Sequence, residues 1–494
     1  MSASLTPPLA RPAPAVAHAP AGRLARRLGP PSLAVVGGAL ALRLVAGVGF
    51  ANYDTLYALA WGGQLSRGQL PSYGVPIAPT PHPLLEALGL VLAPLGPRAA
   101  ERVTVAIGFL ALSGCGWLIY RLAATQFGRA AGAVAALVFL TRVPILSYGV
   151  RAYVDVPFLL LVLGALLVEM RRRRAGAPVL ALLALAGLLR PEAWAFSAVY
   201  WLYLVRGRHA GESLAPYARL AALAAAAPIL WLASDLAVTG KPLWSLTNTR
   251  HTAQTLQRVT GIGNVPEYIP RRIGEILRPP VLAGSALGGV LSLAWLRSRA
   301  IVPALAGALA VVVFALLAAA GLSINTRYAF PAAAVLCVFC GAGVFGWTQL
   351  ERARPARRWW ALAGALVLVA LVAYAPSQYR AGDGEIDKLA RQQQAQGDLL
   401  ALVDDHALNL RCGPVGVPNH APIPLLALYL KTSPARIVSA QVAQIGSGQY
   451  LGPASRAVEE SYVLDPHDPH VAVNVPAGFA RIAANRSWVL FGRC

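Results

Sequence analysis

The sequence has 494 residues, of which 56% are hydrophobic and only 13% are charged. Soluble domains carry about 25% charged residues, so this chain has too few charges to cover a water-soluble body of its size. The composition therefore predicts an integral membrane protein, whose lipid-facing positions are apolar. The net charge is +22, but the arginines form short clusters between apolar runs instead of one basic face, which argues against nucleic-acid binding.

Apolar runs dominate the chain from residue 31 onward. Residues 1–30 are rich in Ala, Pro and Arg without periodicity, and we expect a disordered cytoplasmic tail there. About eleven membrane-spanning helices follow from the length of the runs. They are predicted at 31–50, 102–121, 129–148, 155–170, 176–189, 192–206, 214–238, 281–297, 300–321, 327–349 and 358–376. The pair 176–189 and 192–206 is short, so a hairpin of half the membrane depth is the alternative there.

The arginine clusters predict how these helices are oriented. With the N-terminus in the cytoplasm, every cytoplasmic loop carries arginine, as the positive-inside rule requires. The loops 51–101, 149–154, 190–191, 239–280 and 322–326 then lie outside. The chain is therefore predicted to be a multi-pass plasma-membrane protein with an extracytoplasmic C-terminal region.

Three outside segments are long enough for structure of their own. Residues 84–95 are apolar but short for a span, and we interpret them as an interfacial or re-entrant helix, with a tilted full span as the alternative. Residues 239–280 fit an amphipathic segment in the interface. Residues 377–494 alternate short β-like runs with turns and predict a small α/β domain. An extracytoplasmic location allows a disulfide between Cys412 and Cys494 in it.

Two acidic residues in the outside loops are candidate catalytic groups. Asp54 follows the first helix between the aromatic residues Tyr53 and Tyr57. A carboxyl group there, away from bulk water, is expected to have a raised pKa suited to a general base; the alternative is a cap on the helix that begins at Thr55. Asp155 lies in the next outside loop and has the same two alternatives.

The candidate substrate-binding residues lie on the same predicted face of the membrane. An ionisable group near a membrane helix is a functional hypothesis by default, although interfacial arginines also extend to lipid headgroups. The candidates besides Tyr53 and Tyr57 are His82, Glu86, Arg190, Glu192, Arg250, His251, Arg271, Arg272, Arg327 and Tyr328. Their spacing contains no metal-binding signature. No nucleotide-binding or hydrolase motif is present either.

In chain order, these parts resemble the GT-C superfamily of membrane glycosyltransferases, especially its bacterial polyprenyl-phosphate-sugar-dependent branch. The resemblance covers residues 31–376. It consists of Asp54 after the first helix, an Ala/Gly-rich interfacial helix with a Pro-rich turn from Leu56 to Pro83, Asp155 in the second loop, the run from Leu188 to Glu192, and a late Arg327-Tyr328. The composition is similar to that of actinobacterial proteins.

Two departures from the family pattern concern the first outside loop. Asp54 stands alone where an Asp-Glu pair is common, and Pro81-His82-Pro83 replaces Pro-Pro.

The resemblance implies a sugar transfer outside the cytoplasm. The donor would be a polyprenyl-phosphate-linked sugar, with mannose or arabinose expected, and the acceptor an envelope glycan, lipid or protein. Asp54 would deprotonate the acceptor for an inverting attack, Asp155 would orient the acceptor or support Asp54, and Arg327 would meet the leaving phosphate. No cofactor and no metal are expected, with a divalent cation as the open alternative. The rival interpretations are a lipid-linked glycan flippase or other transporter, and a non-enzymatic assembly partner.

Overall fold

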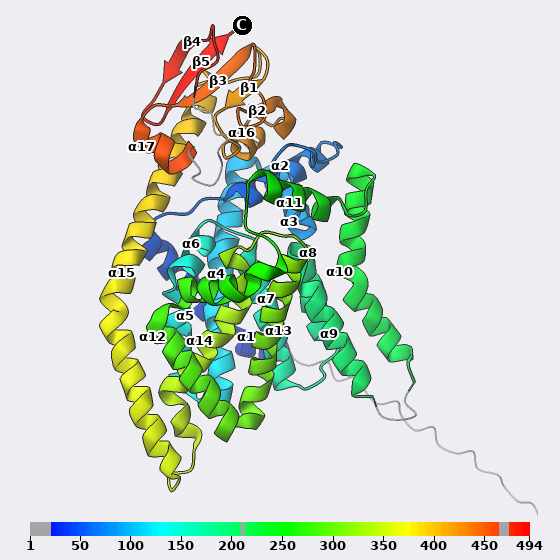
Figure 1. The fold of residues 1–494 in the computed structure, drawn as a ribbon. Helices are drawn as coiled ribbons and strands as arrows, with labels where there is room; N and C mark the ends of the chain where they lie inside the picture. Colours follow the sequence, from blue (N-terminus) through cyan, green and yellow to red (C-terminus); the bar gives the residue numbers. More distant parts are fainter. Residues whose placement is uncertain (1–20, 209–212, 464–473) are drawn as a thin grey trace, which may run out of the picture.

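The chain forms a bundle of apolar helices with a small mixed sheet at one end, in a computed structural model that describes residues 21–208, 213–463 and 474–494 (Figure 1). We call the end of the bundle that carries the sheet the domain end. Residues 1–20 of the predicted N-terminal tail lie outside the described residues, whereas 21–30 belong to the first helix.

The elements follow one another as a long helical part and a short α/β part. The helices up to the bundle's last are α1 Ala21–Ala46, α2 Tyr53–Ser66, α3 Pro83–Leu92, η1 Ala93–Leu95, α4 Pro97–Phe127, α5 Arg129–Leu140, α6 Val143–Val150, α7 Asp155–Arg171, α8 Ala177–Leu189, α9 Glu192–Arg206, α10 Ala215–Thr239, α11 Trp244–Thr255, η2 Ile262–Asn264, α12 Val265–Trp295, α13 Arg297–Ala319, η3 Thr326–Ala329, α14 Phe330–Phe345, η4 Gly346–Gln349 and α15 Pro355–Asp404. The elements after α15 are β1 Val415–Val417, α16 Ile423–Tyr429, η5 Pro434–Arg436, β2 Ile437–Ser439, β3 Gly448–Pro453, α17 Arg456–Val458, η6 Glu459–Val463, β4 Ala480–Ala484 and β5 Trp488–Arg493.

The apolar helices confirm a polytopic membrane protein but not the count of eleven spans. Within the described ranges, six helices are long and apolar enough to cross a membrane, or seven if the bent pair α5–α6 is one span. The helices α8 and α9, which we predicted as a short pair, have only 13 and 15 residues. The segment that begins at Thr326 and contains α14 lies at the centre of the bundle, since 89% of its apolar window is buried.

Two breaks interrupt the helices, one inside a predicted span and one inside a predicted loop. The predicted helix 129–148 bends by 66° between α5 and α6, because Pro144 follows the break and cannot donate a helical hydrogen bond. The buried Arg142 occupies the bend, where its guanidinium donates to the carbonyl oxygens of Val138 and Leu277. The second break is at Arg278, which has a φ of +66° and is followed by Pro279 and Pro280. The predicted loop 239–280 therefore ends inside α12.

The predicted interfacial helix 84–95 corresponds to α3 and η1, which pack against α2. With ten residues, α3 is only about 15 Å long and too short to cross the hydrocarbon core. The two helices approach closely at Gly62 and Gly89: a Cβ at position 62 would lie 2.4 Å from the backbone of Gly89. Glycine at the crossing thus lets α2 lie between the bundle and the sheet.

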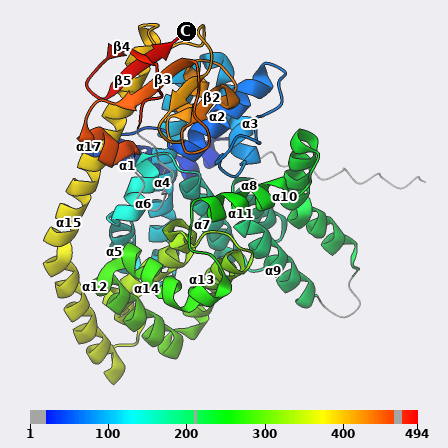
Figure 2. The same cartoon turned by 45° about the horizontal axis from the view of Figure 1, so that its top comes forward.

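The long helix α15 connects the bundle to the C-terminal sheet without interruption. Its 50 residues extend about 75 Å at 1.5 Å per residue, along the outside of the bundle and up to the sheet (Figures 1 and 2). The predicted domain boundary at residue 377 therefore falls inside a helix. The last turns of α15 belong to the core beneath the sheet, where the indole of the buried Trp488 donates to the carbonyl oxygen of Ala395 at 2.7 Å.

The C-terminal sheet has five strands in the order β2-β1-β3-β5-β4. β1 is parallel to β2 and to β3, whereas β5 is antiparallel to β3 and β4. Its hydrophobic core continues into α2 and the segment 73–78, so the sheet is joined to the first outside loop by apolar packing. This packing keeps α2 in a fixed position at the domain end.

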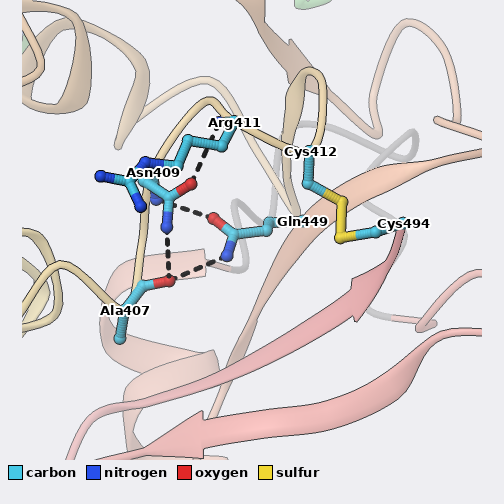
Figure 3. The surroundings of a disulfide bond; sticks show 6 residues. All are labelled: Ala407, Asn409, Arg411, Cys412, Gln449 and Cys494. Carbon is cyan, nitrogen blue, oxygen red and sulfur yellow. Dashed lines mark hydrogen bonds between the residues drawn. A yellow bond between two sulfur atoms is a disulfide. The ribbon is translucent and has the colours of Figure 1, made fainter.

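The structure joins Cys412 to Cys494 by a disulfide, with Cα atoms 5.2 Å apart (Figure 3). Cys412 precedes β1, and Cys494 is the residue after β5, so the bond ties the chain end to the start of the sheet. The remaining cysteines, Cys115, Cys337 and Cys340, are buried and free, in accordance with their apolar sequence context.

Candidate functional site

A cavity of about 330 Å³ opens at the domain end of the bundle. Its lining residues come from segments far apart in the sequence: the start of α2, the turn before α3, the turn between α8 and α9, the domain-end parts of α10 and α11, and the segment 317–328. His420 of the C-terminal domain completes the lining. All five predicted outside loops contribute to this cavity, and all but 149–154, which supplies Val154, contribute polar or charged groups.

Asn52 fixes the start of α2 and with it the position of Asp54. The side-chain oxygen of Asn52 accepts from the backbone amides of Asp54 and Thr55 at 2.8 and 3.3 Å, so Asn52, and not Asp54, is the helix cap. The amide of Asn52 and the hydroxyl of Thr55 also donate to the carbonyl oxygens of Arg151 and Ala152. The first and second outside loops are thereby tied together, and the Asp54 carboxylate is available to the cavity.

The Asp54 carboxylate is paired with Arg327, 273 residues later in the chain. Nη1 of Arg327 lies 2.8 Å from Oδ2 of Asp54 and 3.8 Å from Oδ2 of Asp155. Burial has the largest single effect on the pKa of Asp54 and raises it, but the charge and hydrogen bond of Arg327, together with the interactions with His82 and Arg258, outweigh burial and leave the pKa below its ordinary value of 3.8. The expectation of a raised pKa was therefore wrong: the carboxylate is buried beside a cation, which stabilises its ionised form.

Asp155 and Arg190 form a buried pair next to this contact. The Arg190 guanidinium contacts the carboxylates of both Asp155 and Glu192, and the pair with Asp155 is 6% and 2% exposed. The guanidinium also lies 4.7 Å from the centre of the Tyr328 ring. Asp155 does not line the cavity, and its side chain does not cap α7. Its place between the guanidinium groups of Arg190 and Arg327 makes it a positioning residue.

His82 and Tyr53 add neutral polar groups to the cavity wall. Burial lowers the pKa of His82 to about 4, so the ring is neutral at physiological pH. Its Nδ1 is buried without a hydrogen-bond partner in the part of the chain that is described. The Tyr53 hydroxyl donates to the carbonyl oxygen of Ile77 at 3.0 Å, and its ring packs against His420 at 5.1 Å between ring centres.

Several predicted substrate-binding residues lie away from this cavity. Tyr57 is buried behind Tyr53. Glu86 is buried too, and accepts from the Tyr73 hydroxyl at 2.5 Å and from the His82 amide at 3.1 Å, so it supports the turn before α3.

The four basic residues chosen from loop 239–280 are not among the lining residues either. Arg271 and Arg272 pair with Glu275, Arg250 donates to the carbonyl oxygen of Ala320, and His251 is exposed. The loop does reach the cavity, but through other side chains.

Arg258 is the basic residue of this loop that lines the cavity, and sequence reasoning did not select it. Its guanidinium has no hydrogen bond or ion pair with any described residue, although its charge helps to lower the pKa of Asp54. Nothing in the sequence distinguishes it from Arg250, Arg271 and Arg272, since all four lie in one basic loop. Only the turn after α11 brings it to the cavity.

The buried Asp235 was also missed, because it lies within a predicted span. Its carboxylate accepts from the backbone amide and hydroxyl of Ser245 at 2.8 and 2.7 Å, and the Trp231 indole donates to the same hydroxyl at 3.0 Å. This network fixes the start of α11 against α10. Trp231 and Trp194 then form an aromatic part of the cavity wall.

The described residues contain no group of three or more His, Cys, Asp and Glu side chains that could hold a metal ion. Two of the three acidic side chains in the cavity lining face arginine: Asp54 faces Arg327, and Glu192 faces Arg190, whereas Asp235 accepts from Ser245. Guanidinium groups therefore provide the positive charge next to these carboxylates.

The fold is similar to that of a protein of known structure. The chain is similar to ArnT from Cupriavidus metallidurans bound to undecaprenyl phosphate, with a TM-score of 0.54 and 15% identity over 96% of this chain and 98% of that one. The same protein in the apo state gives a TM-score of 0.52 and 15% identity, over 92% and 96% of the two chains. Comparison of the sequence with protein-family models and with curated proteins gives no match. The fold expected from the GT-C resemblance is thus confirmed.

Proposed function

We propose that this protein is a membrane glycosyltransferase of the GT-C type that transfers a sugar from a polyprenyl-phosphate donor to an acceptor hydroxyl, with Asp54 as the general base. The observation that carries the proposal is the Asp54 carboxylate on a cavity wall, 2.8 Å from Arg327, with the uncommitted Arg258 in the same lining. The ArnT fold supports it, because one structure of that protein contains undecaprenyl phosphate.

In the proposed step, the acceptor hydroxyl attacks the anomeric carbon of the donor. A new carbon–oxygen bond forms as the bond between the anomeric carbon and the phosphate oxygen breaks, with inversion. The hydroxyl proton passes to Asp54, and the polyprenyl phosphate leaves with the bonding electron pair. Because the pKa of Asp54 is low, it is a weak base, and the proton transfers late, after the attacking oxygen has become acidic.

The arginines of the cavity oppose the negative charge that develops on the leaving phosphate. Arg258 has no other described partner and is the first candidate ligand of the phosphate, while Arg327 is shared between phosphate and Asp54. Preorganised cations at such a position lower the barrier by stabilising the transition state more than the ground state. We keep the expectation of metal-independent transfer, since guanidinium groups occupy the positions beside the carboxylates.

The remaining cavity wall suits a sugar and the first part of an isoprenoid chain. Trp194 and Trp231 offer apolar surface, and the orphaned Nδ1 of the neutral His82 offers a hydrogen bond to a hydroxyl group. Cavities for small ligands combine apolar walls with a few polar groups in this way. Mannose and arabinose are the sugars to test, with an envelope glycan, lipid or protein as acceptor and catalysis at the extracytoplasmic face.

The test measures sugar transfer by the purified full-length protein in vesicles, with polyprenyl-phosphate mannose and polyprenyl-phosphate arabinose as donors. Replacing the base by Asp54→Asn is expected to lower kcat about 10²–10⁴-fold, whereas Asp54→Glu retains part of the activity. Asp405→Asn is the matched control, because Asp405 is an exposed acid after α15. Full activity of Asp54→Asn, or an inactive wild type with each donor, contradicts the proposal. Movement of the donor across the bilayer without transfer favours the flippase instead.

A further inference from the structure

A second cavity, of about 600 Å³, lies at the domain end on the side of α1 and α15. Its walls come from α1, the start of α4, the second half of α15 and helix α16 of the C-terminal domain. It shares no lining residue with the cavity at Asp54. It is therefore a separate site, which the proposed sugar transfer does not use.

Three arginines line this second cavity; Arg98 pairs with Asp404, and the other two come from different helices. Arg43 is in the last turn of α1, and Arg102 is in the second turn of α4. Neither guanidinium has a hydrogen bond, ion pair or aromatic contact with a described residue. Arg43 lies in an apolar run whose neighbours Leu44 and Val45 are 82% and 77% exposed, as expected of a helix that faces lipid. A charge at such a position indicates a functional partner.

The carboxylates near these arginines are already committed to other groups. Glu101 accepts from the backbone amide of Ala51 at 3.2 Å and from the Tyr429 hydroxyl at 2.7 Å. Asp404 pairs with Arg98. Neither carboxylate pairs with Arg43 or Arg102, and the three arginines of the lining exceed Glu101 and Asp404 by one positive charge, which an anion in the cavity would balance.

Apart from Gln393, Gln396 and Tyr429, the rest of the cavity is mostly apolar, and it begins on the lipid-facing side of α1. The apolar lining residues include Val36, Leu40, Phe50, Val105, Phe109 and Leu110. A lone interfacial arginine can extend to any headgroup, but here two converge on one cavity whose apolar wall extends from them along α1 and α4. This combination fits a molecule with an anionic head and a hydrocarbon tail.

We propose that this cavity binds an anionic membrane lipid, with its phosphate held by Arg43 and Arg102 and its chain along α1 and α4. Arginine suits this role because its planar donors match phosphate oxygens. Glu101 accepts from the backbone amide of Ala51, which lies three residues before Asp54. The lipid would therefore contact the segment that leads to the first cavity.

The test measures lipid binding to the purified full-length protein by native mass spectrometry, with phosphatidylglycerol as the anionic probe and phosphatidylcholine as the zwitterionic one. The double variant Arg43→Gln/Arg102→Gln is expected to weaken phosphatidylglycerol binding about tenfold and to leave phosphatidylcholine binding unchanged. Arg67→Gln is the matched control, since Arg67 is an exposed arginine at the end of α2 outside the cavity. Ala106→Trp fills the apolar wall without changing charge and should weaken phosphatidylglycerol binding as well.

Two results would overturn the proposal. One is equal binding of phosphatidylglycerol by the wild type and the double variant. The other is displacement of the lipid by inorganic phosphate with no effect of Ala106→Trp, which would mean a simple anion site. Because the measurement is of binding alone, it stands whether or not the protein transfers a sugar.

Discussion

Loss of the Asp155 carboxylate tests whether the buried charges at the site hold one another in place. Asp155 and Arg190 are 2% and 6% exposed, so water screens their interaction weakly. Removing one partner of a buried pair costs about 3–5 kcal/mol, because the other charge is left uncompensated. Arg190 keeps Glu192 as a partner, so we expect Asp155→Asn to lower the free energy of unfolding by about 3 kcal/mol, at the low end of that range.

The substitution Arg190→Met is expected to cost more, about 5 kcal/mol, because it leaves Glu192 without an arginine partner and Asp155 with only Arg327, at 3.8 Å. The double variant Asp155→Asn/Arg190→Met should be less destabilised than the sum of the two, by at least about 1.5 kcal/mol, since interacting residues are not additive. Denaturant titration of the purified protein in detergent, followed by tryptophan fluorescence, gives the four free energies. Additivity within about 0.5 kcal/mol, or an effect of Asp155→Asn no larger than that of Asp405→Asn, would refute the reasoning.

Three further predictions follow from named contacts. Because Arg327 helps to keep the pKa of Asp54 low, kcat/KM of the wild type should not fall with acidification until below about pH 4. In the Arg327→Gln variant, burial raises the pKa of Asp54, so kcat/KM should begin to fall at a higher pH than in the wild type. Burial raises the pKa of Glu86 from 4.5 to about 7. The stability that protonated Glu86 contributes is therefore complete below pH 4.5 and is lost as the pH rises through 7, by roughly 3 kcal/mol. Glu86→Gln should remove this fall of Tm with rising pH, measured from pH 5 to 9. Replacing Cys412 and Cys494 by serine should lower stability by roughly 2–4 kcal/mol, measured as a fall in Tm that reducing agent reproduces in the wild type.

The sequence by itself determined the environment of the chain and the identity of its main charged loop residues. Apolar runs and sparse charge sufficed to predict a polytopic helical protein, because the length of a spanning helix is set by membrane thickness. Asp54, Arg190 and Arg327 were recognisable because a charge beside an apolar helix is unusual in any fold. The terminal cysteines were the two in the polar region, and the structure joins them.

Tertiary structure decided the breaks in the helices and the pKa of the acid. The bend at Arg142 depends on the carbonyl oxygen of Leu277, 135 residues away, which no local pattern contains. The pKa of Asp54 depends on a guanidinium 273 residues later in the chain; together with the interactions with His82 and Arg258, that distant contact reversed the direction expected from burial alone.

The selection of Arg258 among equivalent basic residues was likewise a matter of packing. Four arginines in one loop have the same local chemistry, and the turn after α11 brings Arg258 alone of the four to the cavity. Residue type and hydropathy, which act locally, are readable from the chain. Pairing between loops that are hundreds of residues apart depends on how the bundle folds, and the charge balance of the candidate site depends on that pairing.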